Sequence, residues 1–369
     1  MEPITHFLTG ACMGRAGLNR KTAYATVVAA LAAEAADLDV LWSLVGPVEG
    51  LKHHRGITHT FLAVPVVAAV VVAAVWAWVR WAPGLPWLGA KLAASRRADA
   101  QPVCWGWLYA TAVVAALSHL LLDWTNNYGV RPFFPFNPRW YAGSFMFIVE
   151  PLLWLLFALA FAMPWLLGLA DREIGARRTR FVGQGWAAFA LVGMVSLWGW
   201  RWMAHAEAEQ LVRSSGEITD PIRRVGLEPY PVTPFHWHAI VESDSYYQTA
   251  EVDTLADTVV TDAASDRIYR PRVTPAVAAA RASELGRVYQ DWGRWAVVRD
   301  LGQAPVAGVA PPLLPPGRAW TTVEFTDLRF AYSYLGHDRG VRQVPLTGWA
   351  YVVDGREVAA EGMGAREQR

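Results

Sequence analysis

The residues with the clearest chemical potential are histidines and carboxylates in the first third of the chain. Five of the nine histidines lie there among four carboxylates: His6, His53, His54, His59 and His119, with Glu34, Asp37, Asp39 and Asp123. Imidazole nitrogens and carboxylate oxygens are the usual ligands of catalytic zinc, manganese and non-haem iron. The two cysteines lie in apolar surroundings, as packing residues do. A metal site in this chain would therefore use His, Asp and Glu.

The segment His54–His59, with the sequence HRGITH, directly precedes a long apolar run. Gly56 allows the backbone to turn sharply, and Thr58 is a suitable cap for the helix that follows. The two histidines would then bracket a tight turn. A polar interfacial loop with incidental histidines explains the same residues, and the segment alone does not decide between these interpretations.

A second pair of candidate ligands lies at the end of another apolar run. His119 and Asp123 are four residues apart, so a helix places them on one face. They can offer two ligands to one metal ion, or one ligand and the carboxylate that orients it. Because ionisable groups at the edge of an apolar span are costly unless paired, we favour this interpretation over a histidine satisfied at the interface.

Three carboxylates lie within six residues of a mostly apolar segment. Glu34, Asp37 and Asp39 would repel one another and resist burial, and a bound dication would resolve both problems. We expect Asp37 to be the strongest ligand, whereas Asp39 could simply cap a helix. Glu150, which precedes Pro151 at the start of a later apolar run, is a weaker candidate because it could only complement a helix dipole.

The elements that must position these residues are apolar helices. The chain is 54% hydrophobic and only 18% charged, against about 25% charged in an average soluble protein. Four runs are long enough to cross a hydrocarbon core, and Trp and Tyr cluster near their ends. These predicted spans are Leu62–Val79, Trp105–Leu122, Leu152–Ala170 and Phe181–Trp200. Pro3–Gly14 and Thr22–Val48 are expected to form a re-entrant helical hairpin that turns at Gly17–Lys21 and is packed within protein.

The distribution of basic residues predicts the orientation of these spans, because Lys and Arg favour cytoplasmic loops. One alternate set of connections carries eleven basic residues, including Arg15, Arg20 and Lys21, and the opposite set carries four. We therefore expect a multi-pass protein of the bacterial inner membrane whose residues 205–369 lie on the extracytoplasmic side. The candidate ligands then fall on that same side.

The residues after Trp202 predict a second domain of different character. We expect a mainly α, multi-span transmembrane bundle over residues 1–204, which carries the metal site, and a β-rich α+β domain over residues 205–369. Pro275–Asp291 has helical spacing, and Gln303–Pro316 is a Pro- and Gly-rich loop. The strand-like runs are His236–Ser243, Tyr246–Asp253, Thr258–Thr261, Trp295–Asp300, Thr321–Tyr334 and Trp349–Val353. His236 and His238 share a strand face, but without an expected carboxylate neighbour we favour a structural role for them.

At these residues the chain resembles the YdjM-type family, LexA-regulated membrane-bound bacterial proteins described as metal-dependent hydrolases. The resemblance covers about residues 1 to 200. It rests on Thr5-His6, Asp37-Leu38-Asp39, the HRGITH segment, His119-Leu120-Leu121-Leu122-Asp123 and the loop with Asn126 and Gly129. The chain departs from the pattern at Ala36, where a proline is expected, and at Glu150, where an aspartate is expected. The His-x-x-x-Asp helix also has a distant, pattern-level likeness to zinc-dependent phospholipases C.

The resulting hypothesis is a metal-dependent hydrolase. One or two divalent ions, zinc first and manganese or iron as alternatives, would be held by His6, Asp37, His54 or His59, His119 and Asp123. Asp39 or Glu34 would serve as general base, and Arg55 would steady an anionic leaving group or phosphate. A site at the bilayer edge favours a lipid-linked or amphipathic ester or phosphoester as substrate, with membrane lipid as the surrounding partner.

Two other function classes were weighed. The rival hypothesis is a non-enzymatic membrane scaffold or stress-response protein with a structural metal, which would be fully ligated by protein. A transporter is disfavoured because the third and fourth spans have no ionisable residue at their centres. The formal net charge of +1 gives no indication of nucleic-acid binding.

Overall fold

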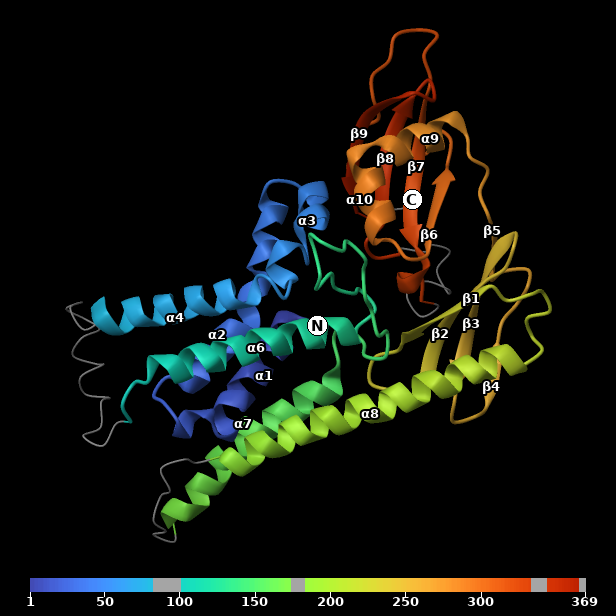
Figure 1. Cartoon of the computed structure of the whole chain (residues 1–369). Coiled ribbons are helices and arrows are strands. Elements are labelled where there is room, and N and C mark those ends of the chain that lie inside the picture. The colour runs from blue at the N-terminus through green and yellow to red at the C-terminus, as the bar shows by residue number, and fades with distance from the viewer. Residues whose placement is uncertain (82–100, 174–182, 333–343, 365–369) are drawn as a thin grey trace. The chain divides into compact units, whose positions relative to one another are not determined.

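The computed structural model describes residues 1–81, 101–173, 183–332 and 344–364 (Figure 1). The chain divides into two compact units, and the second takes up a short segment from the N-terminal third. The first unit comprises Met1–Asp39, Arg55–Met203 and Pro231–Pro234, and the second comprises Val40–His54, Ala204–Tyr230 and Phe235–Arg369.

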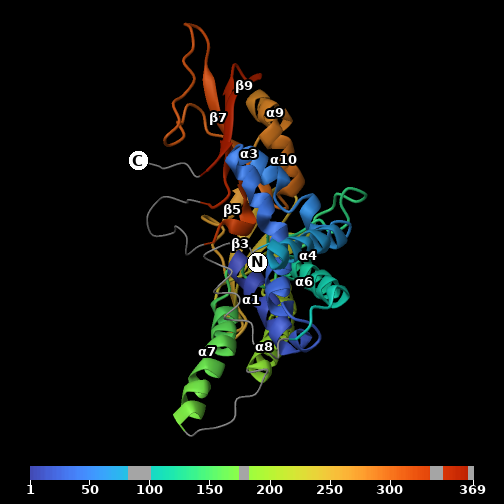
Figure 2. The same ribbon diagram turned by 90° about the vertical axis from the view of Figure 1, so that its left-hand side faces the viewer.

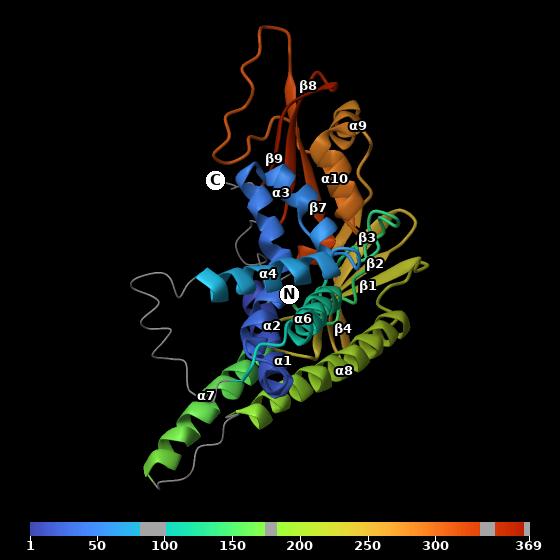
Figure 3. The same ribbon diagram turned by 60° about the vertical axis from the view of Figure 1, so that its left-hand side comes forward.

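Helices build the first unit. They are α1 (Pro3–Ala16), α2 (Ala25–Glu34), α4 (Val64–Trp81), α6 (Trp105–Thr125), α7 (Pro151–Glu173) and most of α8 (Gln184–Ser214), with the 3-10 segments η1 (Leu18–Arg20), η3 (Ile57–His59) and the start of η2 (Ala35–Leu44). α2 packs against both α1 and α6, and α4 packs against α6 (Figures 1 and 3). The carboxylates Asp37 and Asp39 and the histidine His59 therefore lie on short irregular segments that flank this packed group of helices.

Among the residues that the structure describes, three helices are long and apolar enough to cross a membrane. They are Val64–Trp81, Trp105–Thr125 and the part of α7 from Pro151 to Ala170. These helices correspond to the first three predicted spans. The fourth, Phe181–Trp200, overlaps α8, which is not one of the three, and its residues 181–182 lie outside the described ranges together with several of the basic residues that set the orientation. The fourth span and the orientation stay predictions.

Two glycines allow α1 and α2 to pack at backbone distance. A Cβ atom at Gly10 would lie 2.3 Å from the Ala29 carbonyl oxygen, and one at Gly14 would lie 2.4 Å from the Thr26 Cα atom. In lipid no hydrophobic effect drives helices together, so their association depends on the close van der Waals packing that small residues permit. The predicted hairpin is present as two closely packed helices, but its second helix, expected over Thr22–Val48, ends at Glu34, where the chain continues as η2. Its location in the membrane stays a prediction.

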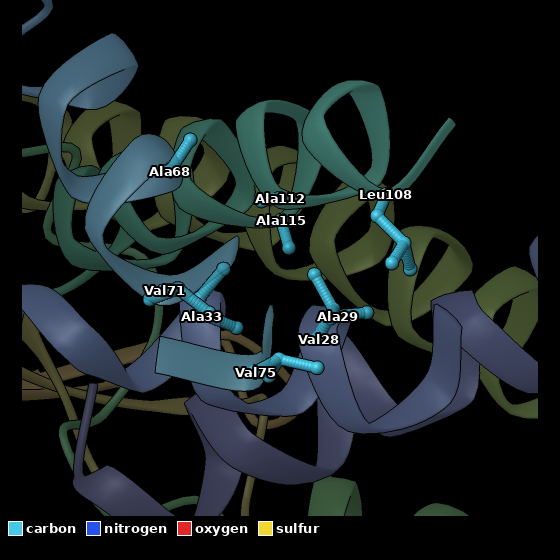
Figure 4. Packing of buried hydrophobic residues seen from close by; sticks show 10 residues of the cluster. Val28, Ala29, Ala33, Ala68, Val71, Val75, Leu108, Ala112 and Ala115 are labelled. Carbon is cyan, nitrogen blue, oxygen red and sulfur yellow. The ribbon is translucent and has the colours of Figure 1, made fainter. Parts of the chain in front are cut away.

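Small and branched side chains fill the contact between α2, α4 and α6 (Figure 4). The buried cluster includes Val28, Ala29 and Ala33 of α2, Ala68, Val71 and Val75 of α4, and Leu108, Ala112 and Ala115 of α6. Because alanine dominates, the three helices approach closely. This packing fixes the end of α6 that carries His119 and Asp123 beside the end of α2 that leads into Asp37.

The second unit contains two antiparallel sheets, as expected of a β-rich domain. One sheet has the order β1-β2-β3-β4 with β5 also on β3, and the other has the order β6-β7-β8-β9. The strands are β1 (Arg224–Pro229), β2 (His236–Glu242), β3 (Tyr246–Asp253), β4 (Thr258–Val260), β5 (Arg267–Tyr269), β6 (Ala296–Asp300), β7 (Trp320–Asp327), β8 (Gly348–Val353) and β9 (Glu357–Met363). Ile240 of β2 packs with Trp295, Val297 and Leu328, which joins the sheets.

Short helices cover the second sheet. α9 (Pro275–Ala282) and α10 (Glu284–Trp292) pack against it, with α3 (Pro47–His53) on α10 (Figure 2). A single helix over Pro275–Asp291 was wrong, because Ser283 is extended and caps α10 by accepting a hydrogen bond from the Gly286 amide. The strand predicted to run from Thr321 to Tyr334 ends at Asp327 and continues as η5 (Leu328–Phe330), and its last two residues lie outside the described ranges.

Candidate metal centre

Four side chains from three separate segments gather into a group that can hold a metal ion. One ligand atom from each of Asp37, His59, His119 and Asp123 lies within 4.8 Å of all the others. Both histidines and Asp123 are fully buried, and Asp37 is 12% exposed. We call this group the four-ligand cluster. It unites the i,i+4 pair on α6 with one carboxylate of η2 and the last histidine of the HRGITH segment.

A hydrogen bond to the backbone of α2 determines which nitrogen of His119 faces the cluster. His119 Nδ1 lies 2.7 Å from the carbonyl oxygen of Ala33, which can only accept a hydrogen bond. The proton of the neutral ring therefore belongs on Nδ1, which leaves the lone pair of Nε2 free. That nitrogen lies 3.4 Å from Asp123 Oδ2 and 3.6 Å from Asp37 Oδ1, and it is buried without a hydrogen-bond partner.

His59 is oriented by a carboxylate in the same way. Its Nδ1 lies 3.1 Å from Asp39 Oδ2, and its Nε2 lies 3.2 Å from Asp37 Oδ1 and 3.3 Å from Asp123 Oδ2. Asp39 is itself held by the Arg55 amide at 2.8 Å and the Thr58 hydroxyl at 3.1 Å. This is the carboxylate–histidine–metal arrangement in which an outer carboxylate fixes the ring of a ligand.

The charges around His59 favour a cation. Burial lowers the pKa of His59, but the carboxylates of Asp123, Asp37 and Asp39 outweigh burial and raise the pKa to about 10. Burial likewise raises the pKa of Asp37, but His59 and the other nearby histidines lower it below its ordinary value. The negative potential that would retain a proton here also favours a divalent cation.

Arg55 contacts the cluster from one side. Its guanidinium lies 2.7 Å from Asp123 Oδ1, donates to the Asn126 side chain at 3.1 Å and to the Gly129 carbonyl at 2.9 Å, and stacks on Tyr128. The side chain is almost fully buried. Arg55 therefore ties a candidate ligand to the Asn126–Gly129 loop that the sequence singled out. The predicted contact with an anionic leaving group stays a prediction.

His6 lies beside the cluster but is not one of its four members. Its ring stacks on that of His119 with 3.9 Å between centroids, and its Nε2 lies 3.2 Å from Asp123 Oδ1 and 4.0 Å from Asp37 Oδ2. His6 is fully buried, and neither of its nitrogens has a hydrogen-bond partner. Buried polar atoms are nearly always paired, so His6 joins the residues that can hold a metal ion.

The other histidines of the first third lie elsewhere. The sequence did not decide between His54 and His59, the two ends of the HRGITH segment. In the structure the four-ligand cluster contains His59 and not His54. His53 is partly exposed on α3, 3.1 Å from Glu49. Glu34 ends α2, and its Oε2 is buried without a hydrogen-bond partner.

Glu150 has a partner that the sequence did not reveal. It forms a fully buried ion pair of 2.6 Å with Arg201 of α8. Arg201 is an isolated arginine in a Trp-rich segment, and nothing in the sequence around it indicates Glu150 as its partner. Glu150 therefore joins the start of α7 to α8 and is not a member of the four-ligand cluster.

The histidines of the second unit have local partners. His236 lies 3.0 Å from Asp253, and His238 lies 3.4 Å from Glu251 and 3.2 Å from the Leu328 carbonyl oxygen. The expectation that no carboxylate lies near them was wrong, because β2 and β3 pair in a register that places both carboxylates opposite them. Among the described residues these side chains form no group of three that could hold a metal, so a structural role is still favoured.

Comparison with known proteins gives one match. No curated protein and no solved structure matches the chain. The family model for YdjM inner membrane proteins matches residues 1–208, which is more than half of the 369 residues and includes the whole four-ligand cluster. The resemblance seen in the sequence is thereby confirmed, and the chain belongs to the YdjM inner membrane protein family.

Proposed function

We propose that this protein is a membrane-bound, metal-dependent hydrolase whose cation is held by Asp37, His59, His119 and Asp123. The observation that carries the proposal is the convergence of these ligand atoms within 4.8 Å, with the His119 Nε2 and Asp123 Oδ2 atoms buried and unpaired. An unpaired buried acceptor is costly, and a cation would remove that cost at both atoms. Membership of the family supplies the membrane location, and the hydrolytic activity is the proposal.

The donor set suits a borderline metal. Two imidazoles and two carboxylates are typical ligands of zinc, with manganese and iron as alternatives. A divalent cation bound here supplies a nucleophilic water at neutral pH and polarises the scissile bond. The protein's own part is to hold the ligands in place, which Ala33 and Asp39 do for the two histidine rings.

Glu34 is the better of the two candidate general bases. Asp39 Oδ2 already accepts from the Arg55 amide and the Thr58 hydroxyl and faces His59, so its hydrogen-bonding capacity serves positioning. Glu34 has one carboxylate oxygen, Oε2, that is buried without a hydrogen-bond partner. Burial raises the pKa of Glu34 to about 8, so this carboxyl is ionised mainly above that pH. We propose that the ionised Glu34 accepts the proton of the attacking water and that Asp39 positions His59.

Exposed apolar residues beside the ligands support a lipid-linked or amphipathic substrate. Leu38, between Asp37 and Asp39, is 62% exposed, and Ile57 and Phe61, on either side of His59, are about half exposed. Phe61 lies three residues before the start of the span α4, and its amide donates to the Pro132 carbonyl. Apolar side chains exposed at this level favour contact with acyl chains, so we propose an ester or phosphoester whose lipid part stays in the bilayer.

Metal analysis of purified protein tests the proposal. Wild-type protein in detergent should retain a divalent cation after dialysis, and His119→Ala should lose it. The matched control is His53→Ala, which removes a partly exposed histidine on α3 outside the cluster. Equal metal content in wild type and His119→Ala would show that the four-ligand cluster does not bind the metal. The wild type should then hydrolyse one of a panel of lipid esters and phosphoesters in nanodiscs, and the activity should be lost in Glu34→Gln while the metal is retained.

A structural metal is the second candidate, and the burial of the ligands favours it. Four protein ligands complete a tetrahedral shell, and three of them are fully buried. Such a shell leaves no position for a water molecule. Water-proton relaxation of the Mn²⁺-loaded protein separates the candidates, because a catalytic ion with an exchanging water enhances relaxation and a closed structural ion does not.

The orientation of the second unit belongs to the same proposal. The excess of basic residues in alternate loops supports an extracytoplasmic position for residues 205–369. A cysteine introduced at Leu313, which is fully exposed, should then react with a membrane-impermeant maleimide in intact spheroplasts. Labelling that appears only after lysis would place this unit in the cytoplasm.

A further inference from the structure

The two aspartates of the cluster each present their oxygens to two different places. Asp37 Oδ1 faces His59 and His119, whereas its Oδ2 faces His6 at 4.0 Å. Asp123 Oδ2 likewise faces His59 and His119, whereas its Oδ1 lies 3.2 Å from His6 Nε2. Both carboxylates therefore connect one position beside the His59–His119 pair with a second position beside His6.

We propose that this centre binds two divalent cations, the second one held by His6 Nε2, Asp37 Oδ2 and Asp123 Oδ1. The inference deepens the proposed function and rests on it, since the second ion would share Asp37 and Asp123 with the first. Carboxylates that give one oxygen to each of two ions are a simple way to hold cations about 3.5–4 Å apart, the separation of two-metal hydrolytic sites.

The state of His6 is the independent observation behind this second position. The ring is fully buried, both nitrogens lack a hydrogen-bond partner, and Nε2 faces the two carboxylates. A buried neutral imidazole normally has at least one hydrogen-bond partner. His6 is not one of the four residues whose ligand atoms gather within 4.8 Å, and its Nε2 faces the other two carboxylate oxygens, Asp37 Oδ2 and Asp123 Oδ1.

The stacking of His6 on His119 sets the spacing of the two positions. Their ring planes are 26° apart and their centroids are separated by 3.9 Å. Two nearly parallel imidazoles that each direct Nε2 at the same pair of carboxylates would hold two ions about one stacking distance apart. That distance is within the range expected for bridged cations.

Two positive groups offer an alternative to the second ion. The Arg55 guanidinium and the α-amino group of Met1 both contact Asp123 Oδ1. A carboxylate oxygen has two lone pairs, so a cation at Asp123 Oδ1 would share this oxygen with Arg55 and displace the α-amino group of Met1. If instead these two groups alone balance the carboxylates, the centre holds a single ion. The two cases differ in the number of bound metals.

The experiment counts and characterises bound Mn²⁺. The protein is purified in detergent, stripped with chelator, reloaded with Mn²⁺ and dialysed. Elemental analysis should give two Mn²⁺ per chain for wild type and for the His53→Ala control, and one for His6→Ala. The electron paramagnetic resonance spectrum of wild type should show exchange-coupled Mn²⁺, and His6→Ala should show only the signal of an isolated ion.

The alternative outcomes contradict the second ion, and they show whether the proposed function fails with it. One uncoupled Mn²⁺ in wild type would show a mononuclear centre and leave the hydrolase proposal standing. Loss of all Mn²⁺ in His6→Ala would assign His6 to the first ion. No Mn²⁺ in wild type would remove both proposals. Should His6→Ala fail to fold, the count and coupling in wild type alone still decide the question.

Discussion

An ion pair of the second unit and the four-ligand cluster of the first unit bury charge in different ways. In the second unit, Arg329 donates to both oxygens of Asp327 at 3.0 Å and to the Trp292 carbonyl at 3.1 Å, and it stacks on the Trp292 ring. Asp327 also accepts from the amides of Arg329 and Trp295. Both side chains are almost fully buried. Protein groups alone therefore satisfy this ion pair.

The four-ligand cluster and its neighbour His6 are buried to the same extent but are not satisfied. His119 Nε2, Asp123 Oδ2 and both nitrogens of His6 lack hydrogen-bond partners. The comparison teaches that burial of charge does not by itself indicate a site. A charged group satisfied by its own protein is typical of structure, whereas a set of unpaired lone pairs that converge on one place requires a ligand.

The largest expected effect follows from removing both histidines of the cluster. Because a site with structural zinc affinity contributes about 10–16 kcal/mol, loss of two of four ligands should cost roughly 5–8 kcal/mol of metal binding. His59→Ala combined with His119→Ala should therefore leave no stoichiometric metal by elemental analysis. The matched control is His236→Ala combined with His238→Ala, which removes two histidines from the second unit and should keep the metal content of wild type. Loss of metal in both double variants would contradict the comparison.

Breaking the ion pair of the second unit should affect stability and spare the metal. Arg329→Met leaves Asp327 buried without its countercharge, which costs about 3–5 kcal/mol. Hydrogen exchange of β6 and β7 should become faster by a corresponding factor, while metal content stays that of wild type. Asp327→Asn combined with Arg329→Met removes both charges and should recover much of the protection. Metal loss in Arg329→Met would show that the two units are energetically coupled.

The outer carboxylate should have a smaller effect than the ligands themselves. Asp39→Asn keeps an oxygen that can accept from the Arg55 amide but removes the charge that orients His59. Loss of such an outer partner weakens metal affinity about 10–100-fold. Titration against a metal buffer measures this shift, and Asp253→Asn, which removes the partner of His236, is the matched control. An unchanged affinity in Asp39→Asn would return Asp39 to the list of candidate bases.

The sequence predicted the elements whose patterns are strong and local. Tyr246–Asp253 is a strand with the predicted bounds, and the first three apolar runs are helices that can span a membrane. β1 was missed because it lies in a segment interrupted by prolines. β9 was missed because Glu357–Met363 has a single buried residue and lacks the alternation of a half-buried strand.

The candidate site shows a similar boundary between what spacing can and cannot predict. Helical spacing placed His119 and Asp123 on one face, and charge repulsion singled out Asp37. The choice between His54 and His59, the Ala33 carbonyl partner of His119 and the carboxylate partner of His59 depend on how segments far apart in sequence meet. No periodicity encodes such contacts, so they became visible only in three dimensions.

The smallest expected effect tests how finely His59 is positioned. Thr58→Val keeps the shape of the side chain but removes the hydroxyl, which lies 3.1 Å from Asp39 Oδ2 and 3.0 Å from His59 Nδ1. One hydrogen bond of this kind contributes about 1 kcal/mol, so metal affinity should fall by roughly fivefold. Ser118→Ala, which removes a hydroxyl that bonds only within α6 and is one residue from His119, should leave the affinity unchanged. If Thr58→Val weakened binding as much as Asp39→Asn, the hydroxyl and the carboxylate would act as one unit. An equal loss in Ser118→Ala would instead indicate a general disturbance of the cluster.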